Sequence, residues 1–339
     1  MRRPALAASA VALLALAGCD FTPTLDVPLP AFEPALTVNG VLAADSTVEV
    51  RVTAAADPYG QYRGGEKFDV PEGATAELLR DGVSAGALRL ASQSCPDYSG
   101  GWTPGEEPPT YECGAFVSDV VAEAGRTYTV RASAPGFPDA EATVTVPERV
   151  DVAVAGGGVV QKPVPGGTRL DTDLTVTVRD PPGPVQQYAL VVVSGPGSWE
   201  QDVYCDEWGC RDSTITVPYD RARIGYTTTD PVLLAGARVV PATGTDLVTF
   251  TDETFDGTQR AFAVRAQQYR FDGGLHERPG LAGVWLASFD AQTFGAYQIA
   301  WFSGGEDNPF AEPANLPSNV VGGHGLLGAV TINEALLDE

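Results

Sequence analysis

Hydrophobic residues recur at every second position along most of this chain, and no other feature constrains its fold as much. Val48, Val50 and Val52 alternate with the polar residues between them, as in a strand that buries one face and exposes the other. An amphipathic helix would instead repeat its apolar residues every three to four positions. The pattern therefore predicts an all-β protein made of short strands and tight turns.

The first part of the chain, residues 35–149, carries five or six such strands in quick succession. Turn signals separate them, including the dipeptides Asp81-Gly82 and Pro135-Gly136. This succession of short strands and turns is typical of an immunoglobulin-like or transthyretin-like β-sandwich, which we predict for this domain. Its predicted strands lie at Thr47–Thr53, Ala76–Arg80, Ala87–Leu90, Tyr128–Ala132 and Ala142–Val146.

A second, larger β-rich domain is predicted for residues 150–339. Near its start, Gly156-Gly157-Gly158 and residues 163–167 flank a weakly patterned join, after which we expect strands to resume at Leu174. One helix is expected near the C-terminus, capped by Asp290 and ended by Gly304-Gly305. Three aromatic residues share one face of this helix and are expected to pack on the sheet: Phe294, Tyr297 and Trp301. The predicted strands lie at Leu174–Val178, Tyr188–Val193, Thr214–Val217, Asp246–Phe250 and Ala261–Ala266.

The N-terminus has the regions of a bacterial lipoprotein signal. Arg2-Arg3 precedes an uncharged run rich in alanine and leucine, which ends at Leu16-Ala17-Gly18-Cys19. The run is too short to span a bilayer comfortably, so we expect residues 1–18 to be cleaved and Cys19 to carry lipid, palmitate included. Residues 19–34, with four prolines, are expected to form an extended tether. The protein would be anchored by lipid in the outer membrane, on its periplasmic or extracellular face.

The charge balance excludes one class of partner. The chain has 21 Lys and Arg residues against 44 Asp and Glu residues, a formal net charge of −23. Nucleic-acid binding needs clustered cations that neutralise phosphates, and this chain lacks such clusters. We therefore expect no nucleic acid among the partners. The acidic excess fits either solubility in a saline medium or the attraction of cations and cationic ligands.

Four cysteines remain once Cys19 is set aside, an even number that favours disulfides in an exported protein. Four cysteines allow three pairings, of which we expect the local one. The expected disulfides are Cys95–Cys113 and Cys205–Cys210. Zinc is the weaker interpretation, because neither pair has C-x-x-C spacing and both histidines, His276 and His324, are remote in sequence.

Large aromatic residues lie on or beside the loops that these disulfides would close. We interpret them as a contact surface for a partner or for an unidentified small-molecule or peptide ligand. Under the alternative interpretation, the aromatic side chains fold back over the end of the sandwich and only pack there. The residues concerned are Tyr98, Trp102, Tyr111 and Trp208.

One acidic segment resembles part of a calcium loop. Asp252, Thr254 and Asp256 occupy the first, third and fifth positions of an EF-hand-like loop, and Gly257 occupies the sixth. The twelfth position is Ala263, which cannot supply the bidentate carboxylate that an EF-hand needs. Two interpretations stay open: a simpler calcium site at Asp252 and Asp256, or a solvated turn whose Asp side chains bond the backbone.

The segment Gly82–Gly86 matches the G-x-S-x-G pattern of a hydrolase nucleophile, with Ser84 at its centre. That nucleophile requires a strand, a strained turn and then a helix, whereas this serine is followed by the predicted strand Ala87–Leu90. Neither histidine belongs to a recognisable triad motif. We therefore expect a protein that is not an enzyme.

Four segments together resemble a known family over nearly the whole mature chain. They are Leu36–Leu42, Phe250–Gly257, Asn308–Phe310 and Pro317–Gly325, and they are similar to the lipoprotein family catalogued as domain of unknown function 4249. Leu326-Leu327 departs from the aromatic residue that is usual after the final glycines.

The resemblance implies an outer-membrane or surface lipoprotein, often encoded beside TonB-dependent receptors and without catalytic residues. The function expected on that basis is binding, as an accessory to a TonB-dependent uptake receptor. The alternative is a structural or adhesive envelope module with no role in transport.

Overall fold

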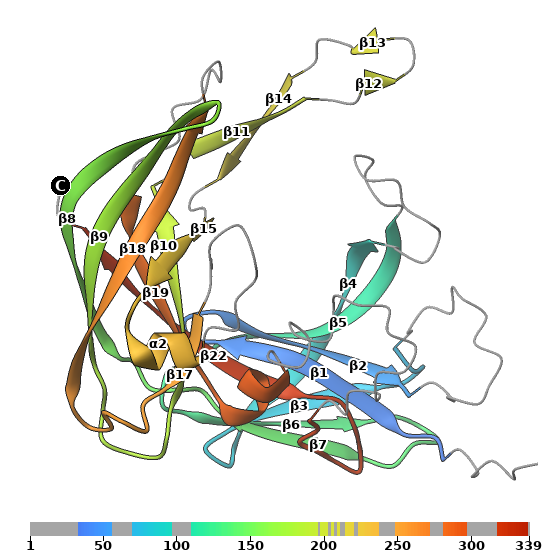
Figure 1. Ribbon diagram of the computed structural model, residues 1–339. Helices are drawn as coiled ribbons and strands as arrows, with labels where there is room; N and C mark the ends of the chain where they lie inside the picture. Colours follow the sequence, from blue (N-terminus) through green and yellow to red (C-terminus); the bar gives the residue numbers. More distant parts are fainter. Residues whose placement is uncertain are drawn as a thin grey trace, which may run out of the picture. The chain divides into compact units, whose positions relative to one another are not determined.

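The computed structural model is built almost entirely of β-strands in the residues that it describes (Figure 1). This confirms the predicted all-β class. All the strands belong to one compact unit, and no helix among the described residues has the length and apolarity needed to cross a membrane. Cys19 and the tether lie outside the described residues. The structure describes residues 33–55, 70–96, 110–195, 197–202, 205–206, 209–210, 214–219, 223–236, 248–271, 281–296 and 317–337.

The strands around the first core follow a path that returns to its starting strand. The hydrogen-bonded order is β1-β2-β5-β4-β3-β6-β7-β20, and β21, which comes directly after β20 and Gly322, pairs in parallel with β1. The other neighbours in this path are antiparallel, as the alternation and the short turns predict. The strands are β1 (Leu36–Ala43), β2 (Thr47–Ala54), β3 (Thr75–Arg80), β4 (Val83–Pro96), β5 (Thr110–Val121), β6 (Thr127–Ser133), β7 (Ala140–Thr145), β20 (Val320–Val321) and β21 (Gly323–His324).

A second group of strands surrounds the second core. Four of them form a separate sheet in the order β16-β18-β9-β8, whereas β15-β10-β19-β22 continue the large sheet as far as β1. Strand β17 pairs with β10. These strands are β8 (Asp151–Val164), β9 (Gly167–Arg179), β10 (Gln187–Ser194), β15 (Arg223–Ile224), β16 (Tyr226–Thr228), β17 (Val248–Thr251), β18 (Gln259–Phe271), β19 (Leu281–Phe289) and β22 (Leu327–Leu336).

The buried apolar residues form two clusters, and the change from one to the other falls between Val146 and Val150. The predicted domain boundary lies at the same place, although the division into two domains stays a prediction. Strand β22 contributes to both clusters, with Leu327 and Ala329 in the first and Ala335 in the second. Figure 1 shows why this is so: β22, in red, lies beside β1, in blue, and pairs with β19 on its other edge.

The join expected between Gly156-Gly157-Gly158 and residues 163–167 is wrong, because the glycines and the residues after them lie inside β8. They face β9, and the pairing register shifts between Gly156 and Val159. Strand pairing uses the backbone N–H and C=O groups that glycine also carries, so a strand can form here without an alternating pattern. A register shift of this kind is where a glycine in a strand is expected.

Two short helices differ in how well the sequence predicts them. Residues 291–296 are helical, and the Asp290 carboxylate accepts hydrogen bonds from the N–H groups of Gln292 and Thr293, at 2.9 and 3.2 Å, as the predicted cap requires. Tyr297, Trp301 and Gly304-Gly305 lie outside the described residues. Helix α2 (Pro231–Gly236) was not expected, although Asp230 before Pro231 is a recognisable start signal.

Candidate functional site

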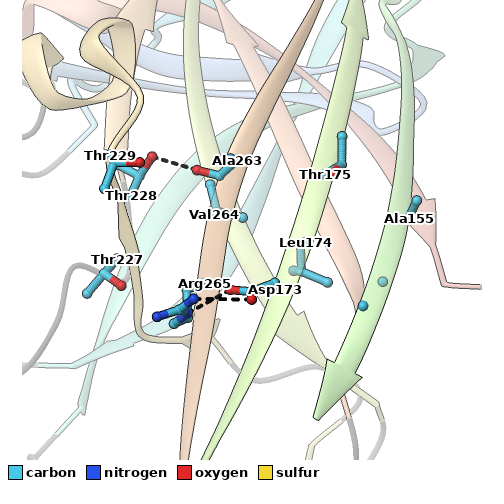
Figure 2. A pocket seen from close by; sticks show the side chains of 12 residues that line it. Ala155, Asp173, Leu174, Thr175, Thr227, Thr228, Thr229, Ala263, Val264 and Arg265 are labelled. Carbon is cyan, nitrogen blue, oxygen red and sulfur yellow. Dashed lines mark hydrogen bonds and ion pairs between the residues drawn. The ribbon is translucent and has the colours of Figure 1, made fainter. Parts of the chain in front are cut away.

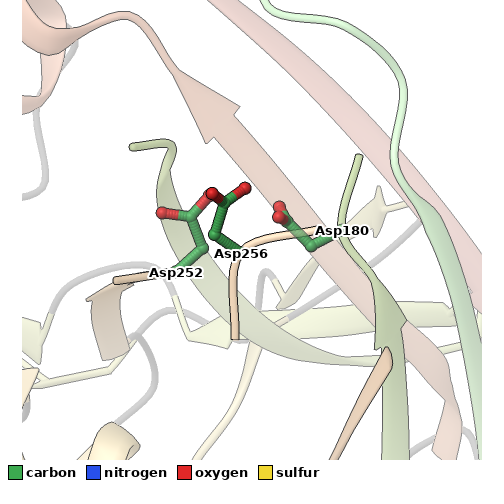
Figure 3. A group of neighbouring side chains, drawn as sticks. All are labelled: Asp180, Asp252 and Asp256. Atoms are coloured by element: carbon green, nitrogen blue, oxygen red, sulfur yellow. The ribbon is translucent and has the colours of Figure 1, made fainter. Parts of the chain in front are cut away.

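Three carboxylates meet at one end of the second core. Asp180 directly follows β9, Asp252 directly follows β17, and Asp256 lies in the turn that leads into β18. One carboxylate oxygen from each lies within 4.8 Å of the other two, and Figure 3 shows the three side chains facing one another. The sequence predicts Asp252 and Asp256 but misses Asp180. Thr254, the third position of the EF-hand-like pattern, is exposed.

Two strand ladders from different sheets hold these residues in place. Asp180 follows Arg179 of β9, which pairs with Gln259 of β18 in the four-stranded sheet. Asp252 follows Thr251 of β17, which pairs with Gln187 of β10 in the large sheet. The turn of residues 252–258 therefore passes from one sheet to the other, and the carboxylates lie where the two sheets are joined.

Gly257 allows this turn to come close to the loop after β9. Its φ angle is 66°, a conformation that glycine adopts without strain. A Cβ at this position would lie 2.9 Å from Cβ of Pro182, closer than side chains tolerate. The Gly257 N–H donates a hydrogen bond of 2.9 Å to Oδ2 of Asp180, so the turn and the first carboxylate are directly linked.

Asp252 is the most deeply buried of the three, with an exposed fraction of 0%. Its Oδ1 accepts a hydrogen bond of 2.9 Å from the N–H of Gln186. Its Oδ2 is also buried but has no hydrogen-bond partner. Burial raises the pKa of Asp252 to about 6, and the neighbouring Asp180 carboxylate adds to the rise while the Gln186 N–H opposes it. Burying a carboxylate oxygen without a hydrogen-bond donor destabilises the folded state, so this atom is a candidate ligand for a cation.

Asp180 is 3% exposed and has two donors, while Asp256 is exposed to solvent. The hydroxyl of Tyr188 donates to Oδ1 of Asp180. Burial, followed by this hydrogen bond, raises the pKa of Tyr188, so the phenol stays protonated and remains a donor. Oδ1 of Asp256 accepts a hydrogen bond of 3.1 Å from the N–H of Gly183.

No lysine or arginine among the described residues forms an ion pair with these carboxylates. Arg260 follows closely in the sequence, but its guanidinium pairs with Asp230 at 3.3 Å. The same guanidinium lies over the rings of Phe255 and Phe262, 5.9 and 5.3 Å from their centroids. The negative charge of the cluster is therefore not balanced by a described side chain.

The first of the predicted disulfide loops is the connection of a long hairpin, β4 with β5. Cys95 lies opposite Tyr111, and Gln93 lies opposite Cys113, so the two cysteines occupy diagonal positions in the register. The Cys113 side chain has a partner. The Cys95 side chain lies outside the described residues, as do Tyr98, Trp102 and the side chain of Tyr111, so the disulfide and the contact surface stay predictions.

The second predicted disulfide lies on a smaller hairpin. Strands β12 (Cys205–Asp206) and β13 (Gly209–Cys210) place Cys205 directly opposite Cys210. The pair β11 (Gly197–Asp202) and β14 (Thr214–Tyr219) flanks it in the sequence, again as two antiparallel strands. Both cysteine side chains and Trp208 lie outside the described residues, so this disulfide is a prediction that the backbone register favours.

A shallow depression on the four-stranded sheet is the other candidate (Figure 2), with a volume of about 500 Å³. Its charged residues, Asp173 and Arg265, pair with each other at 2.6 Å. Its Thr228 hydroxyl donates to the carbonyl of Ala263 at 2.7 Å. These polar groups satisfy one another within the wall, so the depression presents a weaker case for a ligand than the carboxylates do.

Ser84 lies in the β-hairpin that β3 and β4 form. It lies in β4 opposite Leu79, directly after the tight turn at Asp81-Gly82, and its hydroxyl donates to Oε1 of Glu77 at 2.6 Å. His324 is exposed in β21, and His276 lies outside the described residues. The hairpin predicted around this serine is thus present, with a strand rather than a helix after it.

Comparison with known proteins gives one match. A family model described as Domain of unknown function (DUF4249) matches residues 22–335, nearly the whole chain. A search of curated proteins found no match.

Proposed function

The chain belongs to the DUF4249 family, and from that premise we propose that it is a lipid-anchored, non-catalytic binding lipoprotein of the outer membrane or cell surface. Its partner would be a TonB-dependent uptake receptor, to which it would act as an accessory. Family analogy supports the partner, and the signal ending at Cys19 supports the anchor. The strand-built body would then be held at the membrane by acyl chains.

The observation that carries a binding role is the placement of the aromatic loop residues. Trp102 lies in the connection of the β4–β5 hairpin, and Trp208 lies in the connection of the β12–β13 hairpin. Each hairpin carries two cysteines at facing or diagonal register positions. A cross-linked hairpin holds its connection in fewer conformations, which lowers the entropy lost on binding. Large aromatic side chains are typical interface anchors.

The anchor is tested by intact-mass analysis of the protein from the membrane fraction. We expect a mass that corresponds to residues 19–339 with acyl chains, and we expect Cys19→Ser to remain unacylated and to leave the membrane fraction. An unacylated wild-type protein would contradict the anchor.

The partner is tested by affinity recovery of the detergent-solubilised full chain. Trp102→Ala combined with Trp208→Ala is expected to reduce recovery of the TonB-dependent receptor at least about tenfold, since large aromatic anchors contribute about 1.4 kcal/mol or more. Val83→Ala changes a side chain that is 71% exposed at the start of β4, away from the aromatic residues in sequence, and serves as the control. If the wild-type protein recovers no receptor, the structural or adhesive alternative replaces the uptake role.

A further inference from the structure

We propose that Asp180, Asp252 and Asp256 bind one calcium ion, which links the two sheets at this end of the second core. The site is separate from the aromatic loops and from the lipid anchor, so it does not depend on the proposed function. It is built from the ends of β9 and β17 and from the turn before β18.

The spacing of the carboxylates fits calcium. Calcium is bound by about six to eight oxygen atoms at about 2.3–2.6 Å, so two oxygens on one ion lie at most about 5 Å apart. One carboxylate oxygen from each of the three side chains lies within 4.8 Å of the other two. Magnesium, by contrast, demands a strict octahedron at about 2.0–2.1 Å and usually keeps several of its waters. Because Asp256 is exposed, water can complete the coordination.

A second observation is that one atom of the cluster, Oδ2 of Asp252, is buried without a hydrogen-bond partner. The residue is fully buried, its Oδ1 is already bonded to the Gln186 N–H, and Oδ2 has no donor. Buried carboxylate oxygens are normally satisfied by donors or by metal ions. A cation between the three side chains would satisfy this atom.

The surroundings keep the cluster in place without neutralising it. Oxygen atoms of the cluster accept hydrogen bonds from the N–H groups of Gln186, Gly183 and Gly257, which orient the carboxylates. Backbone donors of this kind favour ionised carboxylates but supply no positive charge. A divalent ion would supply the missing positive charge. Because Asp180 follows a strand of one sheet and Asp252 follows a strand of the other, an ion bound to both would stabilise the folded chain.

The test is thermal unfolding of the detergent-solubilised full chain in chelator and in about 5 mM calcium at constant ionic strength. For a dissociation constant of about 0.1–1 mM, we expect calcium to raise the melting temperature by about 2 °C or more. Asp252→Asn keeps the size of the side chain and an oxygen acceptor but removes the charge, and it should reduce this rise by about half or more. Asp119→Asn removes one exposed charge from β5 and should keep the full rise.

Isothermal titration gives a second readout that does not rely on stability. We expect one calcium ion per chain in wild type and in Asp119→Asn, and at least about tenfold weaker binding in Asp252→Asn and Asp180→Asn. Absence of a wild-type response, or an equal response in Asp252→Asn, would overturn the site. An equal response to magnesium would overturn the assignment to calcium.

Discussion

At the scale of single residues, Asp252 shows how a buried carboxylate makes stability depend on pH. Without divalent cations, the folded state binds a proton at this residue up to about pH 6, whereas the unfolded chain releases it near about pH 4. The folded state therefore holds its proton more tightly. The resulting stabilisation is fully present below about pH 4 and is lost as the pH rises through about 6.

We expect Asp252→Asn, measured in chelator, to escape this loss because its amide does not titrate. The difference in free energy of unfolding between this variant and wild type should change by about 1 to 3 kcal/mol in favour of the variant as the pH rises from about 4 to 7. Urea unfolding across this range measures the difference. Asp119→Asn, an exposed carboxyl in β5, is the control and should stay parallel to wild type. Parallel curves for Asp252→Asn and wild type would show that burial does not shift this group.

At the scale of elements, the sequence predicts most strands, because alternation follows directly from burying one face of a sheet. It fails where pairing depends on the backbone alone, as at the glycines of β8. It finds Asp252 and Asp256 because they lie within one turn. Asp180 is missed because only the pairing of β9 with β18 and of β17 with β10 brings it to that turn.

The helical residues 291–296 offer a test of how one side chain links two elements. Asp290 Oδ1 caps the helix through the N–H groups of Gln292 and Thr293, while Oδ2 accepts a hydrogen bond of 2.6 Å from Ala329 of β22. We expect Asp290→Ala to cost about 2 kcal/mol or more, since it removes the cap, the bond from Ala329 and the bond that the Thr293 hydroxyl donates to Oδ2. The Ala329 N–H keeps Thr293 Oγ1 as an acceptor at 2.9 Å.

Asp290→Asn separates the two contributions. Asparagine is also a good N-cap, but its amide nitrogen cannot accept the bond from Ala329. Urea unfolding should therefore place this variant between wild type and Asp290→Ala, at least about 0.5 kcal/mol from each. Equal stability of the two variants would mean that the cap contributes nothing.

At the scale of the whole molecule, strand β22 connects the two apolar clusters. It pairs in parallel with β1 through Leu327–Val330 and in antiparallel with β19 through Val330–Leu336. Val330 is bonded in both ladders, opposite Ala43 and Phe289. No local pattern predicts the parallel partnership of the first and last described strands, because the alternation of a strand does not specify its neighbour.

This arrangement predicts that the two clusters unfold together. Leu327 is fully buried in the first cluster, so Leu327→Ala should destabilise the chain by about 2 to 5 kcal/mol. If β22 couples the clusters, hydrogen exchange should speed up by the same factor in β6, which lies in the first cluster, and in β18, which lies in the second. Val83→Ala, at an exposed position at the start of β4, should change neither. Faster exchange in β6 without a change in the β18 amides would contradict this coupling. The first cluster would then open while the second stays folded around its part of β22, and the two clusters would be independent folding units.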